Sequence, residues 1–364
     1  MKIKNVIKEL EILAPPSLQE SYDNSGLIVG DKNDELNGIL VSLDTTEAVV
    51  QEAIDNNINL IVSHHPIIFS GLKSITGKNY IERVIIKAIK HNISIYAIHT
   101  NLDNVLNGVN QKIADKLGLI DLKILSPKKQ SLLKLSVFIP KGAKEEVKEA
   151  LFESGAGNIG NYSHCSFSSN GIGSFKANEN AKPYVGGKNE IHFEEEIKVE
   201  VVLPSHLQSK VVSALLNAHP YEEVAYDLYP IINKNKLIGS GMIGRLKEDM
   251  DEEAFLRFVK DKMKTDCIRY TTLLNKNVRK VAFCGGAGDF LLDAAITQNA
   301  DVFISGDFKY HRFFDAENKL VIFDIGHYES EQFTIDLIGD FLKEKFSTFA
   351  IRFTEVKTNP INYF

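Results

Sequence analysis

Short apolar runs alternate with helical patterns in the first third of the chain. The segments TEAVVQEAIDNN and NYIERVIIKAIKHN repeat apolar residues every three to four positions, which indicates helices with one buried face. The runs around them are rich in Val, Ile and Leu, which is typical of strands buried on both faces. Strands are therefore expected within residues 38–44 (GILVSLD), 60–69 (LIVSHHPIIF) and 94–103 (SIYAIHTNLD). Alternating strands and helices predict an α/β domain with a mostly parallel sheet.

The same alternation returns near the end of the chain. RKVAFCGGAG leads into DFLLDAAITQN, DVFISGD into KYHRFFDAEN, and LVIFDIG into HYESEQFTIDLIGDFLKEKF. One α/β domain is therefore expected to be built from both chain ends, with residues 1–125 as its first half and 248–364 as its second half.

The middle of the chain has a different pattern. Residues 133–140 and 197–204 each resemble a strand that ends in proline, and each precedes a helical pattern. This weak internal repeat fits a duplicated β-α-β unit, as in a ferredoxin-like α+β module. We expect residues 126–247 to form such a domain, inserted into the α/β domain.

Composition and charge exclude several classes of protein. The 364 residues are 44% hydrophobic and 25% charged, as in an ordinary globular protein, and the formal net charge is −6. The chain therefore has no overall positive charge for binding nucleic acid or an anionic membrane, and neither partner is expected.

The cysteines and the N-terminal segment indicate a cytoplasmic location. Cys165, Cys267 and Cys284 are scattered, which favours reduced thiols over a disulfide framework. Glu9 and Glu11 interrupt the first apolar stretch, so this stretch is not expected to be a signal peptide.

Polar residues gather where the predicted strands end. Ligands of open α/β sheets bind at the carboxyl ends of the strands, so these positions are candidates for a site. The polar residues there are Asp44, His64, His65, His99, Asp103, Asp307, His311, Asp324, His327 and Glu331. They include five of the ten histidines, which favours a shared metal or catalytic site over scattered histidines.

The spacing of these residues favours metal binding. His327 and Glu331 are four residues apart at the start of a predicted helix, so they project from one face. In an extended chain, the neighbours His64 and His65 point to opposite sides, which suits two metals a few ångströms apart. Asp103 supplies a carboxylate that could bridge them. Three imidazoles and two carboxylates suit two divalent ions of Zn, Mn or Fe.

Six motifs in order resemble the dinuclear-metal family of Nif3-like proteins, whose members are also called GTP cyclohydrolase I type 2 homologues. The motifs are SYDNSGLIVG (21–30), SHHPIIF (63–69), HTNLD (99–103), CGGAGD (284–289), SGDFKYH (305–311) and DIGHYESE (324–331). The resemblance covers essentially the whole chain, and residues 155–176 and 219–230 resemble the PII-like insert of longer bacterial members. Tyr22 stands where many members carry tryptophan, which keeps an aromatic side chain.

The resemblance implies that His64, His65, Asp103, His327 and Glu331 bind two divalent metals. It also implies a toroidal homohexamer with a Nif3-like domain interrupted by a PII-like module.

These features predict a metal-dependent hydrolase in which metal-bound water attacks a nucleotide or a related small molecule. By resemblance, the substrate is GTP, opened at its imidazole ring. His99 and His311 lie outside the ligand set and are the candidates for proton transfer or substrate contact.

Two other functions remain open from the sequence. A two-metal phosphoesterase is the first, although Ser63 stands where an Asp-His-His motif needs aspartate. A non-catalytic metal-binding scaffold or adaptor with a small-molecule-sensing insert is the second. The CGGAGD turn also fits either a phosphate cradle or a plain tight turn.

Overall fold

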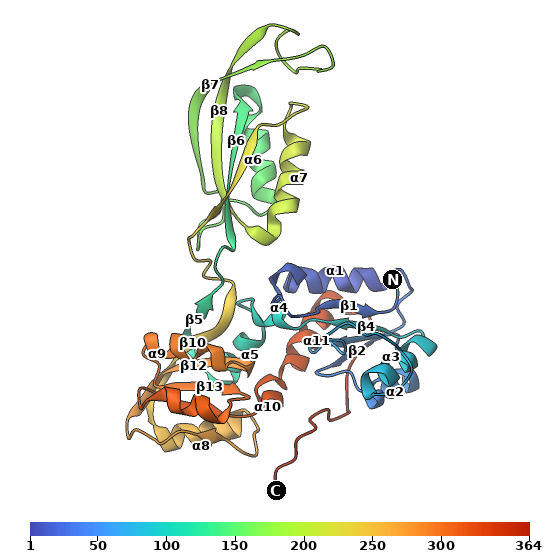
Figure 1. Cartoon of the computed structure of the whole chain (residues 1–364), viewed down its shortest axis with the longest axis vertical. Coiled ribbons are helices and arrows are strands. Elements are labelled where there is room, and N and C mark those ends of the chain that lie inside the picture. Colours follow the sequence, from blue (N-terminus) through green and yellow to red (C-terminus); the bar gives the residue numbers. More distant parts are fainter. The chain divides into compact units, whose positions relative to one another are not determined.

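The computed structural model describes residues 1–364 and divides them into two units (Figure 1). Unit 1 consists of Met1–Pro127 and Lys236–Phe364, and unit 2 of Lys128–Asn235. An α/β domain formed by both chain ends and interrupted by an α+β module is thereby confirmed. Unit 2 is shorter than the expected insert of 126–247, because Gly239–Asp251 forms strand β10 of a sheet in unit 1.

The first sheet of unit 1 has the strand order β1-β4-β3-β2-β15. Its strands are β1 (Gly26–Val29), β2 (Ile39–Ser42), β3 (Leu60–Ser63), β4 (Ser94–Ala97) and β15 (Ile351–Phe353). All pairs are parallel except β1 with β4. Helices cover both faces, which explains why the strands are apolar without alternation.

Two separate clusters of buried side chains form these two faces. Ile39 and Val41 of β2 pack in the cluster that contains α1 (Ile3–Leu13) and α11 (Thr334–Lys345). Leu40 packs on the opposite face with α2 (Glu47–Asp55) and α3 (Tyr80–Lys90).

The second sheet of unit 1 has the order β11-β14-β13-β12-β10-β5. Its strands are β5 (Ile120–Pro127), β10 (Gly239–Asp251), β11 (Arg269–Tyr270), β12 (Asn277–Ala287), β13 (Val302–Gly306) and β14 (Val321–Asp324). Only β12, β13 and β14 are parallel to one another. Its helices are α5 (Val109–Leu117), α8 (Glu252–Lys262), α9 (Leu292–Thr297) and the 3-10 helix η5 (Tyr310–Ala316).

One hydrophobic core joins the two sheets. The cluster that holds Val41 and Val62 of the first sheet also holds Phe283 and Ile304 of the second. Unit 1 therefore has two mixed sheets on a common core, where the apolar pattern alone suggested one mostly parallel sheet.

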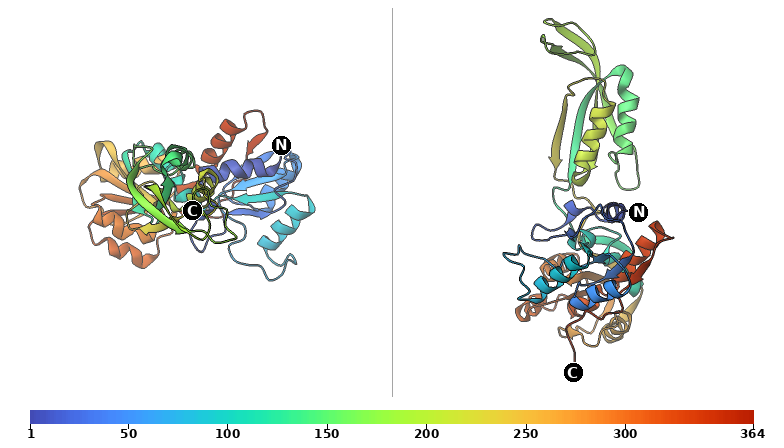
Figure 2. Two further views of the ribbon diagram at one scale, coloured as in Figure 1. Left: turned by 90° about the horizontal axis from the view of Figure 1, so that it is seen from above. Right: turned by 90° about the vertical axis from the view of Figure 1, so that its right-hand side faces the viewer.

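Unit 2 has the element order β-α-β-β-α-β of a ferredoxin-like module. Its elements are β6 (Leu132–Pro140), α6 (Lys144–Glu153), β7 (Ser166–Lys176), β8 (Ile191–Pro204), α7 (Gln208–Ala218) and β9 (Tyr226–Ile231). The antiparallel sheet has the order β7-β8-β6-β9, and both helices lie on one of its faces (Figure 2). Pro140 and Pro204 end the two corresponding strands, as the repeat predicted.

Two predicted strands end earlier than their apolar runs. β3 stops at Ser63, immediately before His64, and β4 stops at Ala97. Thr100–Asp103 then forms the short helix α4 instead of strand. The chain therefore leaves regular pairing just where the candidate site residues begin.

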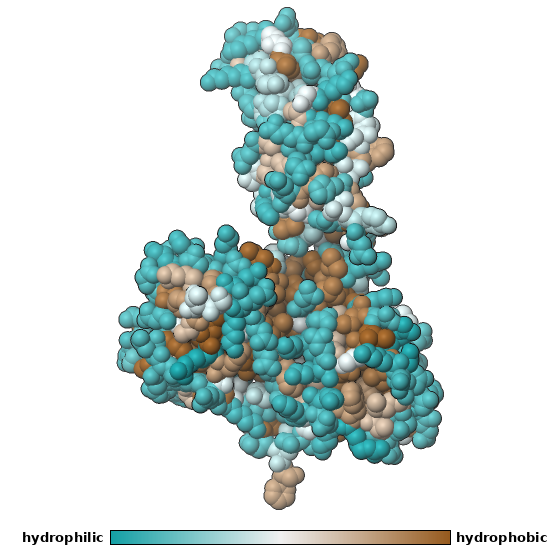
Figure 3. Space-filling model, turned by 180° about the vertical axis from the view of Figure 1, so that it is seen from behind, coloured by the Kyte–Doolittle hydropathy of each residue, from teal (hydrophilic) through white to brown (hydrophobic).

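No helix of the chain is both long and apolar enough to cross a membrane. Hydrophilic side chains cover most of the face of the molecule drawn in Figure 3.

Gly339 of α11 provides a test of the packing between this helix and β15. A Cβ atom at Gly339 would lie 1.9 Å from Cε1 of Phe353. Glycine to alanine inside a helix usually stabilises by about 1 kcal/mol, but here overpacking should reverse the sign and cost about 1–3 kcal/mol. We expect Gly339→Ala to lower the free energy of unfolding in chemical denaturation.

The double variant Gly339→Ala/Phe353→Ala is the control. Because the clash disappears with the ring, its loss of stability should be smaller than the sum of the two single losses. A Gly339→Ala protein as stable as the wild type would contradict this packing.

Candidate metal centre

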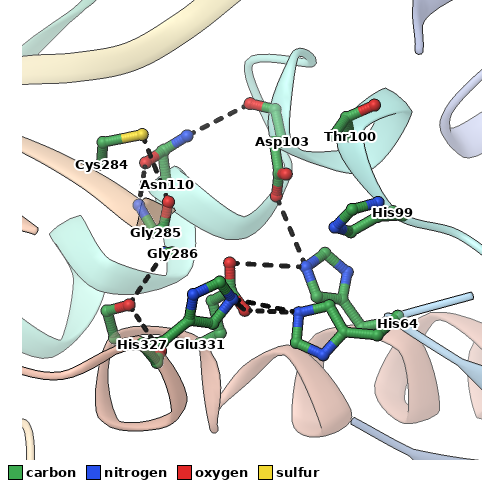
Figure 4. Close-up of polar contacts among 12 residues, drawn as sticks. His64, His99, Thr100, Asp103, Asn110, Cys284, Gly285, Gly286, His327 and Glu331 are labelled. Atoms are coloured by element: carbon green, nitrogen blue, oxygen red, sulfur yellow. Dashed lines mark hydrogen bonds and ion pairs between the residues drawn. The ribbon is translucent and has the colours of Figure 1, made fainter. Parts of the chain in front are cut away.

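The five predicted metal ligands converge from both sheets of unit 1. Figure 4 shows four of them, His64, Asp103, His327 and Glu331. His64 and His65 directly follow β3, and Asp103 is the last residue of α4. His327 and Glu331 are the two ends of helix α10 (His327–Glu331), which follows β14 of the second sheet. The site therefore depends on segments that are more than 200 residues apart in the sequence.

Glu331 lies at the centre of the cluster, and its side chain is 3% exposed. Its Oε2 atom lies 2.9 Å from Nε2 of His65 and 3.1 Å from Nε2 of His327. Its Oε1 atom lies on the other side, 3.7 Å from Nε2 of His64. His64 Nε2 is also 3.6 Å from Oδ1 of Asp103.

A specific acceptor holds the outer nitrogen of each of these three imidazoles. Nδ1 of His64 donates to the carbonyl oxygen of Ile98 at 2.8 Å. Nδ1 of His65 donates to Asp44 at 2.8 Å, and Nδ1 of His327 donates to Asp307 at 2.7 Å. Each bond fixes the ring and turns Nε2 toward Glu331, which is the arrangement that orients histidine ligands in metal sites.

Buried atoms without partners support the fit of this cluster to a cation. Nε2 of His64 and Oδ1 of Asp103 are both buried without a hydrogen bond, which is costly unless another group binds them. Nε2 of His65 and Nε2 of His327 are 3.3 Å apart. Donor atoms around one tetrahedral ion lie roughly 3.3–3.6 Å apart, so these separations suit ligation.

The ligand atoms form two groups that share Glu331. His65, His327 and Glu331 make one group, and the atoms that each residue offers lie within 4.8 Å of one another. His64, Asp103 and Glu331 make the second group by the same measure. Each group combines imidazole nitrogen with carboxylate oxygen, so the cluster could hold metal ions of the Zn, Mn or Fe type.

The charges of the cluster shift the pKa values of its members. Burial opposes the charged form of His65, but Glu331 and Asp44 outweigh it and raise its pKa to about 10. Burial likewise opposes the imidazolium of His327, but Glu331 and Asp307 raise its pKa to about 11. Burial raises the pKa of Asp103 to about 7, and the nearby Glu331 carboxylate adds to the effect. Without a bound cation, these side chains therefore hold protons that a cation would displace on binding.

The structure separates the two candidates for proton transfer. His99 lies beside the cluster, with its ring centroid 5.2 Å from that of His64 and 5.3 Å from that of His65. Its Nδ1 donates to Asp23 at 2.7 Å. His311 is exposed on η5, where its ring contacts Tyr310 and Phe314, and it does not line the cavity at the cluster.

The cluster opens into a cavity of about 790 Å³ in unit 1. His65, His327 and Glu331 line it, together with His99 and Thr358 of the C-terminal segment. A volume of this size accommodates a small organic molecule.

Several residues of the site received no role in the sequence analysis. Asp44 and Asp307 were noted at strand ends, but only the structure shows that they orient His65 and His327. Asp23 and Thr358 were not singled out. Thr358 donates to Oδ2 of Asp44 at 2.7 Å, so it supports the bond from Asp44 to His65. No local sequence pattern signals a contact between residues 314 positions apart.

The fold and the cluster define an α/β protein with a candidate histidine–carboxylate metal centre between two sheets. The chain belongs to the Duf34/NIF3 (NGG1p interacting factor 3) family, whose model matches residues 1–360. The resemblance inferred from the six motifs is thereby confirmed.

Relatives of full length support this assignment. The chain is 41% identical over 371 aligned residues to a protein of Halalkalibacterium halodurans named GTP cyclohydrolase 1 type 2 homolog, with 100% of both chains covered. It is 38% identical to a Bacillus subtilis protein of the same name, covering 99% of this chain and 98% of that one. The crystal structure of a Bacillus cereus protein related to NIF3 superposes with a TM-score of 0.86 at 37% identity, covering 100% of this chain and 99% of that one.

Gly286 leaves the space that Glu331 occupies, which gives a test of the site. A Cβ atom at Gly286 would lie 2.4 Å from Glu331 Oε1 and 3.2 Å from Cε1 of His327. We expect Gly286→Ala to bind metal at least about tenfold more weakly. The added Cβ atom would displace Glu331, and disturbing the groups around a ligand weakens metal binding. Elemental analysis of the purified protein and a competition titration with a chelating dye would measure the loss.

Gly118→Ala is the matched control. Gly118 has φ +62°, close to the +63° of Gly286, but a Cβ atom there meets nothing within 4 Å. Both variants place a Cβ atom on a residue of similar positive φ, so only Gly286→Ala, where that atom meets Glu331, should lose metal. Equal metal content in the two variants would argue against the site.

Metal binding should also depend on pH. The raised pKa values of His65 and His327 keep both rings protonated near neutral pH, so a cation must displace their protons. We expect affinity to fall as the pH falls from about 8 to about 6, with about two protons released per ion at this group. Calorimetry in buffers of different ionisation enthalpy measures the release, and an affinity independent of pH would contradict the assignment.

Proposed function

We propose that the chain is a dinuclear-metal-dependent hydrolase that acts on a nucleotide or a related purine compound. The observation that carries this proposal is the shared carboxylate of Glu331, which offers Oε2 to one ligand group and Oε1 to the other. Two ligand groups on one carboxylate at the floor of an open cavity suit two-metal hydrolysis.

The ions in this proposal are two divalent cations of Zn, Mn or Fe. His65 and His327 would hold one with Glu331, and His64 and Asp103 would hold the other. A pair of divalent cations, when bound, lowers the pKa of water and polarises the bond to be broken.

The chain's own residues would position and move the protons. Asp44, Asp307 and the carbonyl of Ile98 keep the three imidazoles in the tautomer that presents Nε2. Asp23 accepts the Nδ1 proton of His99, so Nε2 of His99 is the atom that would exchange a proton with substrate or water. Thr100 and Ser25 also donate to Asp23, which fixes the pair in place.

The proposed substrate is inferred from the names of two relatives. Two relatives that match along the whole chain are called GTP cyclohydrolase 1 type 2 homolog. We therefore propose hydrolytic opening of a purine imidazole ring. The active form is proposed to be a toroidal homohexamer, which light scattering would report as about six chain masses.

Turnover of GTP tests this function. Protein loaded with Zn, Mn or Fe should convert GTP to a formylated or ring-opened product, detected by chromatography and mass spectrometry. Because Nε2 of His65 contacts Glu331 directly, we expect His65→Ala to lower turnover at least about 100-fold. His91→Ala, at an exposed position that ends α3, should retain full turnover.

Other outcomes identify the competing functions. Equal turnover by His65→Ala would reject the proposed site. Hydrolysis of phosphodiesters without any purine ring opening would indicate a phosphoesterase. Metal binding without turnover of either class would favour a scaffold.

A further inference from the structure

The wall of the metal cavity carries many negative charges. Its lining includes five carboxylates and no lysine or arginine. The carboxylates are Glu20, Asp44, Asp103, Asp307 and Glu331. Two divalent cations would therefore leave about one formal negative charge in excess. A triphosphate entering this cavity would meet carboxylates instead of the cationic side chains that bind phosphate.

The glycine-rich segment at the end of β12 holds its three glycine N–H groups in bonds within the protein. Its amide groups already donate to side chains of the protein: Gly285 to Asn110 at 3.1 Å, Gly286 to Ser330 at 2.9 Å, and Gly288 to Ser305 at 2.9 Å. Anion binding at such turns needs free N–H groups. Asn110, Ser330 and Ser305 therefore hold this segment in place, which favours a tight turn at the end of β12 over a phosphate cradle.

Two longer helices, α2 and α3, start at the cavity, and the N-termini of both are occupied. Thr46 lines the cavity at the N-terminus of α2 and caps this helix by accepting the N–H of Val49, and Glu47 places a carboxylate in its first turn. Asn79 caps α3 by accepting the N–H of Glu82, which also places a carboxylate in the first turn. These features satisfy the positive ends of both helices from within the chain.

Aromatic side chains supply a different kind of surface in the same cavity. Tyr22, Phe69, Tyr80 and Phe290 line it, and each is at least half exposed. Phe69 lies next to the candidate metal site, because its ring meets that of His99 at a centroid distance of 5.6 Å. Exposed rings in a cavity offer faces on which a flat heterocycle can stack.

We infer that this cavity recognises the uncharged purine ring of its substrate through its exposed aromatic side chains, and that no lysine or arginine of the cavity adds a contact to a polyphosphate. The inference rests on the proposed function for the choice of purine and goes beyond it by assigning recognition to the base. A nucleoside or free base is then the preferred form of the substrate.

A binding experiment on the full-length, zinc-loaded protein tests this preference. Equilibrium dialysis would compare guanosine, GTP and inorganic tripolyphosphate, with the retained ligand checked by chromatography. We expect guanosine to bind, GTP to bind no more tightly than guanosine, and tripolyphosphate not to compete. Phe69→Ala should weaken guanosine and GTP binding equally, by about tenfold or more.

Phe314→Ala is the matched control, because Phe314 is also an exposed phenylalanine but does not line the cavity. It should leave guanosine binding unchanged. Tighter binding of GTP than of guanosine, competition by tripolyphosphate, or no guanosine binding would each overturn the inference. Guanosine binding without any turnover would reject the hydrolase proposal instead and leave this inference standing.

Discussion

The buried carboxylate of Glu331 is the constraint on which the architecture of the site depends. A carboxylate that is only 3% exposed needs partners for both oxygens. Oε2 contacts the imidazoles of His65 from the first sheet and His327 from its own helix, and Oε1 faces His64 of the first sheet at 3.7 Å. These contacts form only if the two sheets keep a fixed position relative to each other, and the hydrophobic core that they share holds them in that position. The core and the candidate metal centre are therefore two consequences of the same packing.

The surroundings of the cluster show how the chain holds ligands from distant segments. β3 ends directly before His64, and the N–H groups of His64 and His65 still donate to the carbonyl oxygens of Ser42 and Leu43 at the end of β2. Asp44 orients His65 and is itself tied to Thr358, near the C-terminal end of the chain. Gly286 leaves the space that Glu331 fills. The site is thus formed by strand ends, a tight turn and the C-terminal segment, and the fold brings all of them to one cavity.

The sequence predicted the helices and strands better than it predicted which strands pair with one another. Apolar periodicity located the main strands, and the proline-ended repeat predicted the ferredoxin-like unit, because both signals are local. The sequence could not show that β15 pairs with β2, nor that the strands form two sheets. Strand pairing joins segments that are far apart in the sequence, and a local pattern does not reveal it. The five metal-ligand candidates followed from residue type and spacing. The roles of Asp44 and Asp307 could not be inferred in this way, because a hydrogen bond that orients a ligand produces no pattern in the sequence. His311 shared the strand-end position of the others, yet η5 carries it to the surface.

We propose that Glu331 joins two ligand groups, each of which would hold a divalent cation. Anomalous X-ray diffraction from crystals of the zinc- or manganese-loaded protein tests it most directly. Two peaks are expected, one next to Oε2 of Glu331 with His65 and His327, and one next to Oε1 with His64 and Asp103. No peak at Glu331, or a single ion bound elsewhere in the chain, would contradict it.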